Sequence, residues 1–198
     1  RGNSLMGLEE GDQYSLRDLL YGMMLPSGND AAQTAAVAAG RAIGGSNLTP
    51  EEASQVFVKE MNRQAAELGM TESHFANADG FHHDDHYTSM SDLVILASTV
   101  LADPTIVGYT STIEDTVTLQ GHTEEWKNTN FLLNPAFAYY IPSTIGLKTG
   151  YTGEAGSCLI SAFFEGDRIV LIGVFGCPAY TEDRYLDTAE LYNTTILH

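Results

Sequence analysis

The sequence predicts an α+β protein in which a helical part is packed on an antiparallel sheet that is followed by a closing helix. Apolar residues recur at helical spacing through roughly the first hundred residues. The period then becomes that of strands between residues 145 and 176, and helical spacing returns over 181–197. Helices followed by strands, rather than alternating with them, are typical of antiparallel sheets. We expect a helical part over about 12–110 and a sheet with its C-terminal helix over about 111–198.

The first two predicted helices flank a turn of sequence Pro-Ser-Gly-Asn. Ser15 and Asp18 form a variant of the capping box, and leucines and methionines follow at helical spacing until Pro26 ends the helix. The second helix, over 30–42, is rich in alanine and apolar almost all round, which is typical of a buried helix. A glycine pair at 44–45 predicts its end.

Two further helices have clear start signals. Thr49-Pro50 with two following glutamates predicts a helix that ends at Gly69. Its expected inward stripe consists of Val56, Phe57, Met61, Ala65 and Leu68. Residues 70–88 are rich in turn-forming residues and contain four histidines. A helix is then expected over 89–102, capped by Ser89 with Asp92 and ended by Pro104.

The second half of the sequence predicts strands. Residues 116–119 form one candidate, and 145–152, 156–165 and 168–176 form three more that are rich in Ile, Val, Leu and Phe. The turn Glu165-Gly166-Asp167-Arg168 predicts that the last two form a hairpin. The closing helix has apolar side chains available for packing: Tyr185, Ala189, Leu191 and Tyr192.

Composition excludes several classes of function. The 198 residues include 26 acidic and 9 basic side chains, for a formal net charge of −17. Such a chain lacks the basic surface that nucleic acids or anionic membranes require. No apolar run approaches the length of a membrane-spanning helix. The length predicts a single domain, with two small domains as the alternative.

Two short motifs could carry chemistry. Ser27-Gly28-Asn29 lies between two predicted helices, and Lys148-Thr149-Gly150 lies in a predicted strand. Each is weak alone, because Ser-x-Asn is also a common helix cap. Together and in this order, they match two of the three signature elements of penicillin-binding proteins and class A β-lactamases, Ser-x-x-Lys, Ser-x-Asn and Lys-Thr-Gly.

The surroundings of the motifs are more specific. The sequence resembles D-alanyl-D-alanine carboxypeptidases, the low-molecular-weight penicillin-binding proteins, in order over nearly its whole length. The segments that carry the resemblance are 21–32, Asn77 to Gly80 with His86-Tyr87 and Asp92, 128–133, and 146–152 with Ala155-Gly156. The resemblance implies a β-lactamase/transpeptidase-like fold. It also implies a cell-envelope location outside the cytoplasm and a reaction that needs no cofactor.

The Ser-x-x-Lys element of this family, which supplies its nucleophile and general base, does not occur in these residues. The residues three positions before the three lysines are Val56, Glu124 and Ile145. We expect that the sequence begins downstream of the nucleophile, so that the nucleophile helix and first strands of the fold are missing. A natural pseudoenzyme that binds peptidoglycan is the alternative. We expect the chain alone to be inactive and unlabelled by penicillin, and to need the missing segment or a second copy to complete its sheet.

The resemblance assigns roles in acyl transfer from a peptidoglycan stem peptide ending in D-Ala-D-Ala, with β-lactams as substrate mimics. Ser27 would belong to the proton relay to the leaving amine, and Asn29 would hold the substrate amide. Lys148 and Thr149 would bind the terminal carboxylate. Gly150 would leave room for the substrate along the strand edge, and the N–H of Tyr151 would be one oxyanion donor.

Other interpretations of the same residues remain. A β-lactamase of this fold is an alternative, although Ser-Gly-Asn replaces Ser-Asp-Asn. The cluster His82-His83-Asp84-Asp85-His86 could bind zinc, but we interpret it as a solvated loop with a structural His86 and predict no metal site. Cys158 and Cys177 could be cross-strand neighbours, depending on register, and we expect buried free thiols.

Overall fold

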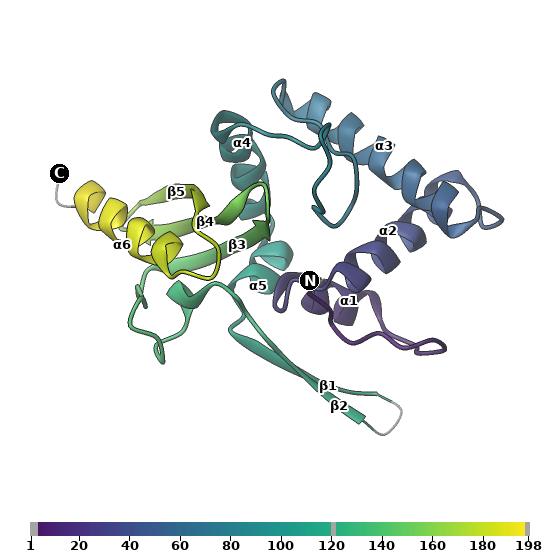
Figure 1. The fold of residues 1–198 in the computed structure, drawn as a ribbon, viewed down its shortest axis with the longest axis horizontal. Helices are drawn as coiled ribbons and strands as arrows, with labels where there is room; N and C mark the ends of the chain where they lie inside the picture. Colours follow the sequence, from purple (N-terminus) through teal and green to yellow (C-terminus); the bar gives the residue numbers. More distant parts are fainter. Residues whose placement is uncertain (1–3, 120–121, 197–198) are drawn as a thin grey trace.

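The computed structural model describes residues 4–119 and 122–196, and it has the predicted succession of helices, strands and a final helix (Figure 1). The helical part contains α1 (Leu16–Met24), α2 (Asn29–Gly44), α3 (Pro50–Leu68), α4 (Met90–Leu101) and α5 (Pro104–Ser111). The rest contains β1 (Glu114–Leu119), β2 (His122–Lys127), the 3-10 turn η1 (Phe131–Leu133), β3 (Thr144–Thr152), β4 (Gly156–Glu165), β5 (Arg168–Cys177) and α6 (Asp183–Ile196). The α+β class is confirmed.

The main sheet is antiparallel and has the order β3-β4-β5. Glu165 pairs with Arg168, so the predicted hairpin between β4 and β5 is confirmed. In the described part of the chain, β5 pairs only with β4 and is therefore an edge strand, as is β3 on the other side. β3 carries the Lys-Thr-Gly motif along this outer edge.

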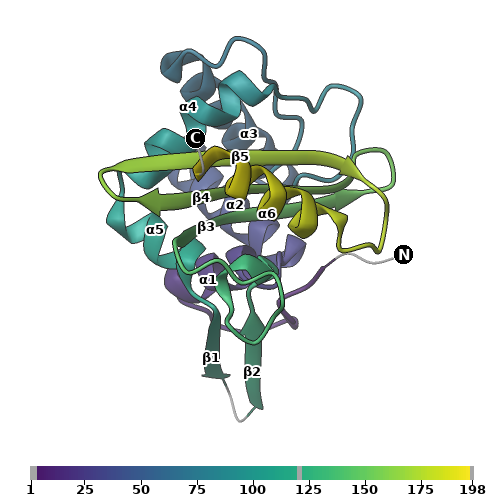
Figure 2. The ribbon, with the colours of Figure 1, turned by 90° about the vertical axis from the view of Figure 1, so that its left-hand side faces the viewer.

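Helices cover both faces of the main sheet (Figure 2). On one face, α6 closes a core made of Leu132, Ile141, Leu159, Phe163, Ile172, Val174, Cys177 and Tyr185. On the opposite face, Ala97 of α4 packs with Leu147 and Ala162, and α5 lies against β3. The alternation of side chains along each strand divides its apolar residues between these two cores.

The helix boundaries follow the predicted caps. Ser15 and Thr49 both form complete capping boxes, and Gly69 ends α3 in the left-handed conformation with φ of 84°. One helix was not predicted, because Pro104 does more than end α4. It is the first residue of α5, and the Asp103 carboxylate accepts hydrogen bonds from the backbone N–H groups of the first turn.

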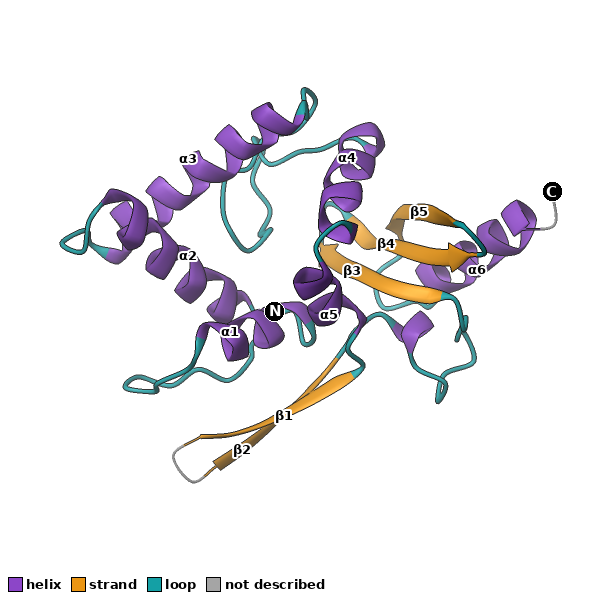
Figure 3. Ribbon diagram, turned by 180° about the vertical axis from the view of Figure 1, so that it is seen from behind, coloured by secondary structure: helices purple, strands orange, loops and turns teal. Residues whose placement is uncertain are grey.

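The predicted strand at 116–119 is half of a separate two-stranded sheet. β1 pairs with β2 through the register Glu114↔Lys127, and the hairpin extends away from the main sheet (Figure 3). β2 was missed because its sequence, His-Thr-Glu-Glu-Trp-Lys, has little apolar content. Its one large apolar residue, Trp126, is buried and donates from Nε1 to the Met6 carbonyl at 2.9 Å.

Three predictions of burial in the helices were wrong. The α2 helix is buried only at Ala31, Ala32, Ala36 and Gly40, and its other residues are half-buried or exposed. Leu68 and Leu191 are both exposed. Tyr185, Ala189 and Tyr192 do pack on the sheet core as expected. Leu197, the last residue of the predicted closing helix, lies outside the described residues.

Across the described ranges, no single helix has both the length and the apolar composition of a membrane span. The helices α4 and α5 meet these criteria only when counted together, and they are bent by 106° where they join.

Candidate active site

Ser27 lies in a strained turn between α1 and α2. Its φ is 64°, a left-handed conformation that is uncommon for a residue with a side chain. The structure places Gly28, not Ser27, at the N-cap of α2, so the helix-cap interpretation of Ser27 is wrong. The backbone N–H of Gly28 donates to the Gly22 carbonyl and that of Asn29 to the Ser4 carbonyl. These bonds hold the turn while the Ser27 hydroxyl remains available for other partners.

Lys148 connects the two predicted motifs. Its Nζ donates to Ser27 Oγ at 2.7 Å and to the Thr149 carbonyl at 2.9 Å. Burial disfavours the charged amine, and the nearby Arg184 guanidinium repels it, so that the pKa of Lys148 falls to about 8 from its ordinary value of 10.5. A lysine in this range exchanges protons readily near neutral pH. The structure therefore brings together Ser27 and Lys148, which are 121 residues apart in sequence.

The side chain of Thr149 is hydrogen-bonded to that of a second threonine, Thr129. The two hydroxyl oxygens, Oγ1 of Thr129 and Oγ1 of Thr149, are 2.5 Å apart, and Thr149 is only 8% exposed. Thr129 lies in the Asn128–Leu133 segment, whose flanking asparagines are buried and hydrogen-bonded. Sequence reasoning noted this segment for its resemblance and assigned it no role in the site.

Arg184 is the site residue that sequence reasoning missed. Its Nη1 donates to the Gly150 carbonyl at 3.5 Å, and its Nη2 donates to the Tyr185 hydroxyl at 3.0 Å. A second positive charge therefore lies beside the Lys-Thr-Gly strand. One signal was available in the sequence. The chain has only 9 basic residues, and it places one of them, Arg184, in the first turn of its last helix. A cation there is unfavourable for the helix dipole, and such a placement can indicate another role.

The remaining predicted residues surround this centre. Asn29 is half-buried, and its side chain forms no hydrogen bond with another described residue. Gly150 is exposed at the sheet edge. The Tyr151 side chain is 46% exposed and lies against the ring of Tyr180, with ring centroids 5.6 Å apart. The Tyr151 ring thus packs at the surface and not in a core.

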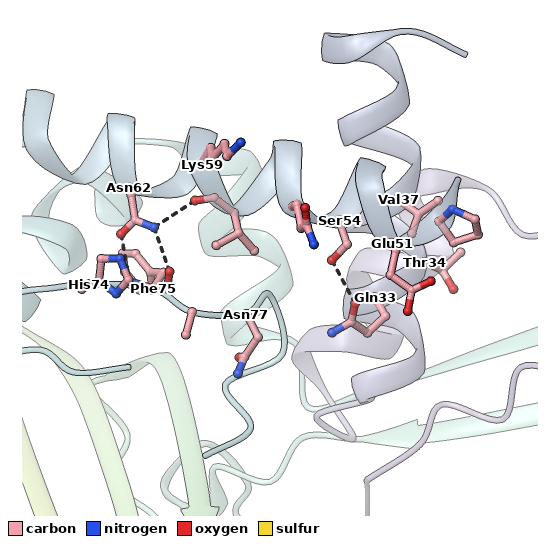
Figure 4. Close-up of a pocket in the computed structure, with 14 residues that line it drawn as sticks. Gln33, Thr34, Val37, Glu51, Ser54, Lys59, Asn62, His74, Phe75 and Asn77 are labelled. Carbon is pink, nitrogen blue, oxygen red and sulfur yellow. Dashed lines mark hydrogen bonds between the residues drawn. The ribbon is translucent and has the colours of Figure 1, made fainter. Parts of the chain in front are cut away.

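A pocket of about 840 Å³ lies elsewhere, between α2, α3 and the loop at 74–77 (Figure 4). Ser54 donates to Gln33 across it, and Asn62 bonds the Val58 and Phe75 carbonyls along its wall. None of its lining residues belongs to the Ser-Gly-Asn or Lys-Thr-Gly motif. This pocket therefore lacks the chemistry of the two motifs.

His86 has the expected structural role in the loop at 70–88. Its ring is half-buried against the ring of Phe75, and its Nδ1 accepts a weak hydrogen bond from the Ala76 N–H at 3.4 Å. Burial lowers the pKa of His86. Within the described ranges, no three His, Cys, Asp or Glu side chains gather as a metal site would require.

Both cysteines are free thiols, as expected, but only Cys177 is buried, so the expected burial of Cys158 is wrong. Cys158 pairs with Gly150 and is half-buried, whereas Cys177 pairs with Ser157 and is buried against α6. Because Ser157 and Cys158 are successive residues of one strand, the two cysteine side chains point to opposite faces of the sheet.

Comparison with known proteins agrees with this geometry. The family described as D-alanyl-D-alanine carboxypeptidase matches residues 1–178. D-alanyl-D-alanine carboxypeptidase DacF of Bacillus subtilis is 35% identical over 182 residues, which cover 91% of this chain and 43% of that protein. A D-alanyl-D-alanine carboxypeptidase of a Streptomyces species is 35% identical over 167 residues, covering 81% of this chain and 54% of that protein. The chain thus spans about half the length of these relatives.

The fold comparison reaches the same result. The crystal structure of the Streptomyces K15 DD-transpeptidase has a TM-score of 0.85 and 31% sequence identity, and it covers 98% of this chain and 72% of that one. Its match extends over the helices and the antiparallel sheet, so the expectation of a transpeptidase-like fold is confirmed. Sequence, fold and motif geometry agree, and the chain belongs to the D-alanyl-D-alanine carboxypeptidase family, with the fold of the penicillin-binding proteins.

Proposed function

We propose that this chain forms most of the catalytic domain of a serine-type D-Ala-D-Ala carboxypeptidase, which removes the terminal D-alanine from peptidoglycan stem peptides outside the cytoplasm. The observation that carries the proposal is the 2.7 Å hydrogen bond from Lys148 Nζ to Ser27 Oγ, beside the exposed strand edge at Gly150. A cation, a hydroxyl and an open strand edge at one point suit a peptide that ends in a carboxylate.

The proposed carboxylate anchor consists of Lys148, Thr149 and Arg184. Two cationic side chains and one hydroxyl can satisfy both oxygens of a terminal carboxylate. The chain carries a net charge of −17, so an anionic substrate is repelled by most of the surface and needs this local positive charge. Exposed Gly150 lets the substrate backbone lie along β3, where the N–H of Tyr151 would donate to the developing oxyanion.

Ser27 and Asn29 have the proposed roles on the leaving-group side. The Lys148 amine, with a pKa of about 8, and the Ser27 hydroxyl form a path by which a proton can reach the departing D-alanine nitrogen. The Asn29 side chain, which has no partner among the described residues, would hold the substrate amide. β-Lactams would enter the same site as substrate mimics and acylate the nucleophile.

The nucleophile and general base must come from a Ser-x-x-Lys segment outside these residues. Two features support a place for it. β5 is an edge strand with exposed Ile169 and Phe175, and α2, although rich in alanine, is only partly covered. Both features fit a segment that adds a strand to β5 and a helix beside α2. A second copy of the chain on the β5 edge would be the competing occupant, and sedimentation of the chain with and without the segment distinguishes the two.

The test compares the 198-residue chain with a longer polypeptide of the same gene that includes the upstream Ser-x-x-Lys. We expect only the longer form to release D-alanine from an N-acylated D-Ala-D-Ala peptide and to be labelled by a fluorescent penicillin. Lys148→Met should abolish release, whereas Lys127→Met, at an exposed lysine, should not change it. A gene without upstream Ser-x-x-Lys would favour the non-catalytic alternative, and rapid turnover of penicillin would favour a β-lactamase.

A further inference from the structure

Hydrogen bonds to the backbone and to the side chain of Thr129 connect α6 to the Lys-Thr-Gly strand. Tyr185 of α6 is 2% exposed, and its hydroxyl donates to the Thr129 carbonyl at 2.6 Å. The same hydroxyl accepts from Arg184 Nη2 at 3.0 Å. Thr129 in turn brings its own hydroxyl to within 2.5 Å of the Thr149 hydroxyl. Arg184, Tyr185, Thr129 and Thr149 therefore form one network that extends from α6 to the Lys-Thr-Gly motif.

The chemistry of the partners fixes the direction of the first two bonds. A guanidinium can only donate and a carbonyl can only accept. The Tyr185 hydroxyl must therefore accept from Arg184 and donate to Thr129, which commits its single proton. Its ring is stacked on Phe131 and Tyr139, with centroids 5.0 and 5.4 Å away, so the hydroxyl oxygen is held in place between these two partners.

Thr129 is also held from its other side. Its backbone N–H donates to the Leu25 carbonyl at 3.2 Å, one residue before the Pro-Ser-Gly-Asn turn. Its neighbours Asn128 and Asn130 are 8% and 1% exposed, and their side chains bond the Thr110 carbonyl and the Ser161 hydroxyl. A threonine fixed this firmly can orient the hydroxyl of the residue it touches.

The contact between the Thr129 and Thr149 hydroxyls determines the direction in which the Thr149 proton is donated. Each hydroxyl has one proton, so only one of the two can donate across the 2.5 Å contact. When an anion lies outside Thr149, the favourable arrangement has Thr129 donating to Thr149 and Thr149 donating to the anion. A peptide that ends in a neutral amide carries no negative charge there, and its amide can itself donate. The Thr149 hydroxyl therefore stabilises it less than a carboxylate.

We propose that Tyr185 and Thr129 are positioning residues that make the site select a peptide with a free carboxylate over one with a neutral C-terminus. Tyr185 keeps Thr129 and Arg184 in place, and Thr129 directs the Thr149 proton outward. This selection rests on the proposed function, because it acts on the carboxylate anchor described there.

The test uses the longer polypeptide that includes the upstream Ser-x-x-Lys, with the serine of that motif replaced by alanine so that no turnover interferes. Calorimetric titration measures its affinity for two ligands, N-acetyl-D-Ala-D-Ala and its C-terminal amide. We expect wild type to prefer the acid. Tyr185→Phe and Thr129→Val should each reduce the ratio of acid to amide affinity by roughly five- to tenfold, the usual effect of losing a hydrogen bond in a charged network. Thr129→Ser, which restores the hydroxyl, should restore the ratio.

Tyr192→Phe is the matched control. Tyr192 lies on the same helix and its hydroxyl is also hydrogen-bonded, but its partners are Ser143 and Glu165, away from the motif. It should leave the ratio unchanged. An unchanged ratio in both Tyr185→Phe and Thr129→Val overturns the positioning role and leaves the proposed function intact. An equal loss of affinity for both ligands has the same meaning. Equal binding of acid and amide by wild type would instead overturn the carboxylate anchor, and this inference with it.

Discussion

The core around the sheet and the contact between α2 and α3 differ in the size of their buried side chains. Around the sheet, the fully buried residues include Phe163, Leu159 and Tyr185, and α6 and the strands enclose them. In α2 and α3 the buried residues are alanines and a glycine, which let the two helices approach closely. The sheet core therefore contains large buried side chains, whereas α2 and α3 meet through small ones.

This difference indicates how the site is divided. Lys148, Thr149, Thr129 and Arg184 belong to the well-packed part and are held by buried hydrogen bonds. Asn29 begins α2, the helix with small buried side chains and partial cover, and Ser27 precedes it in the turn. Because apolar burial is the main source of stability, we expect the anchor side of the site to be rigid and the Ser27 side to open first. Four expected effects test this comparison.

The largest effect should come from the sheet core. Phe163 is fully buried, and Phe163→Ala should lower the free energy of unfolding by about 3–5 kcal/mol through lost burial and a cavity. Phe164 is the matched control, because it is the next residue on the same strand and is 56% exposed. Phe164→Ala should change stability by less than about 1 kcal/mol. Urea denaturation measures both, and similar losses would show that the sheet core is not the stable part.

The second effect arises where the two parts meet. The Lys148 pKa is lowered to about 8 in the folded chain, so between this value and 10.5 the unfolded state binds more protons. The contribution of Lys148 to stability therefore rises with pH across this window, by up to about 3 kcal/mol. Lys148→Met should remove that rise when unfolding is compared at several pH values.

The same pKa can be measured directly. The chain has three lysines, so a carbon-13 NMR titration contains few lysine signals, and the one lost in Lys148→Met belongs to Lys148. We expect its midpoint near pH 8. A midpoint near the ordinary lysine value would mean that the amine is well solvated and that the seam between the two parts is open.

The third effect tests the close approach of α2 and α3. A Cβ added at Gly40 would lie 1.9 Å from the Ala53 carbonyl oxygen, so Gly40→Ala should separate the helices and cost about 1–3 kcal/mol. Gly108 in α5 has no atom within 4 Å of an added Cβ. Gly108→Ala should stabilise the chain by about 0.5–1 kcal/mol, from helix propensity alone. Hydrogen exchange should show faster opening of α2 and α3 in the first variant, with the sheet unaffected.

The smallest effect concerns acid stability in the helical part. Burial lowers the pKa of His86 below its ordinary value of 6.5, so the unfolded state takes up a proton first as the pH falls. The stability that neutral His86 contributes is present above pH 6.5 and is lost below it. His86→Gln should reduce this loss, whereas His82→Gln, at an exposed histidine, should not. Identical acid unfolding of all three proteins would show that His86 has no influence on the loop.

Much of the fold was predictable from local signals. The caps at Ser15 and Thr49, the glycine stop at 69 and the hairpin at 165–168 were each confirmed, because backbone hydrogen bonding at these positions depends on nearby residues alone. The start of α5 was missed because Pro can end one helix and begin another. The β1–β2 hairpin was missed because its strands have few apolar residues and depend on one distant contact, from Trp126 to Met6.

The site was predictable as motifs but not as a network. The two tripeptides identified Ser27 and Lys148, whose contact is present in the structure. Arg184, Tyr185 and Thr129 have no motif of their own in the sequence reasoning, because their roles arise from tertiary contacts across 34 and 56 residues. The burial of α2 was overestimated for a related reason. Apolar composition shows that a helix can be covered, whereas the fold decides which residues cover it.

Trp126 is the one tryptophan of the chain, and it is 2% exposed. Its indole N–H bonds the Met6 carbonyl, and Met6 and Leu25 are members of the same core. Indole fluorescence therefore reports on a single place, the attachment of the chain's first described segment to the β1–β2 hairpin and the helix before Ser27. A red shift that precedes the loss of far-ultraviolet circular dichroism would show this segment detaching while the rest of the protein stays folded.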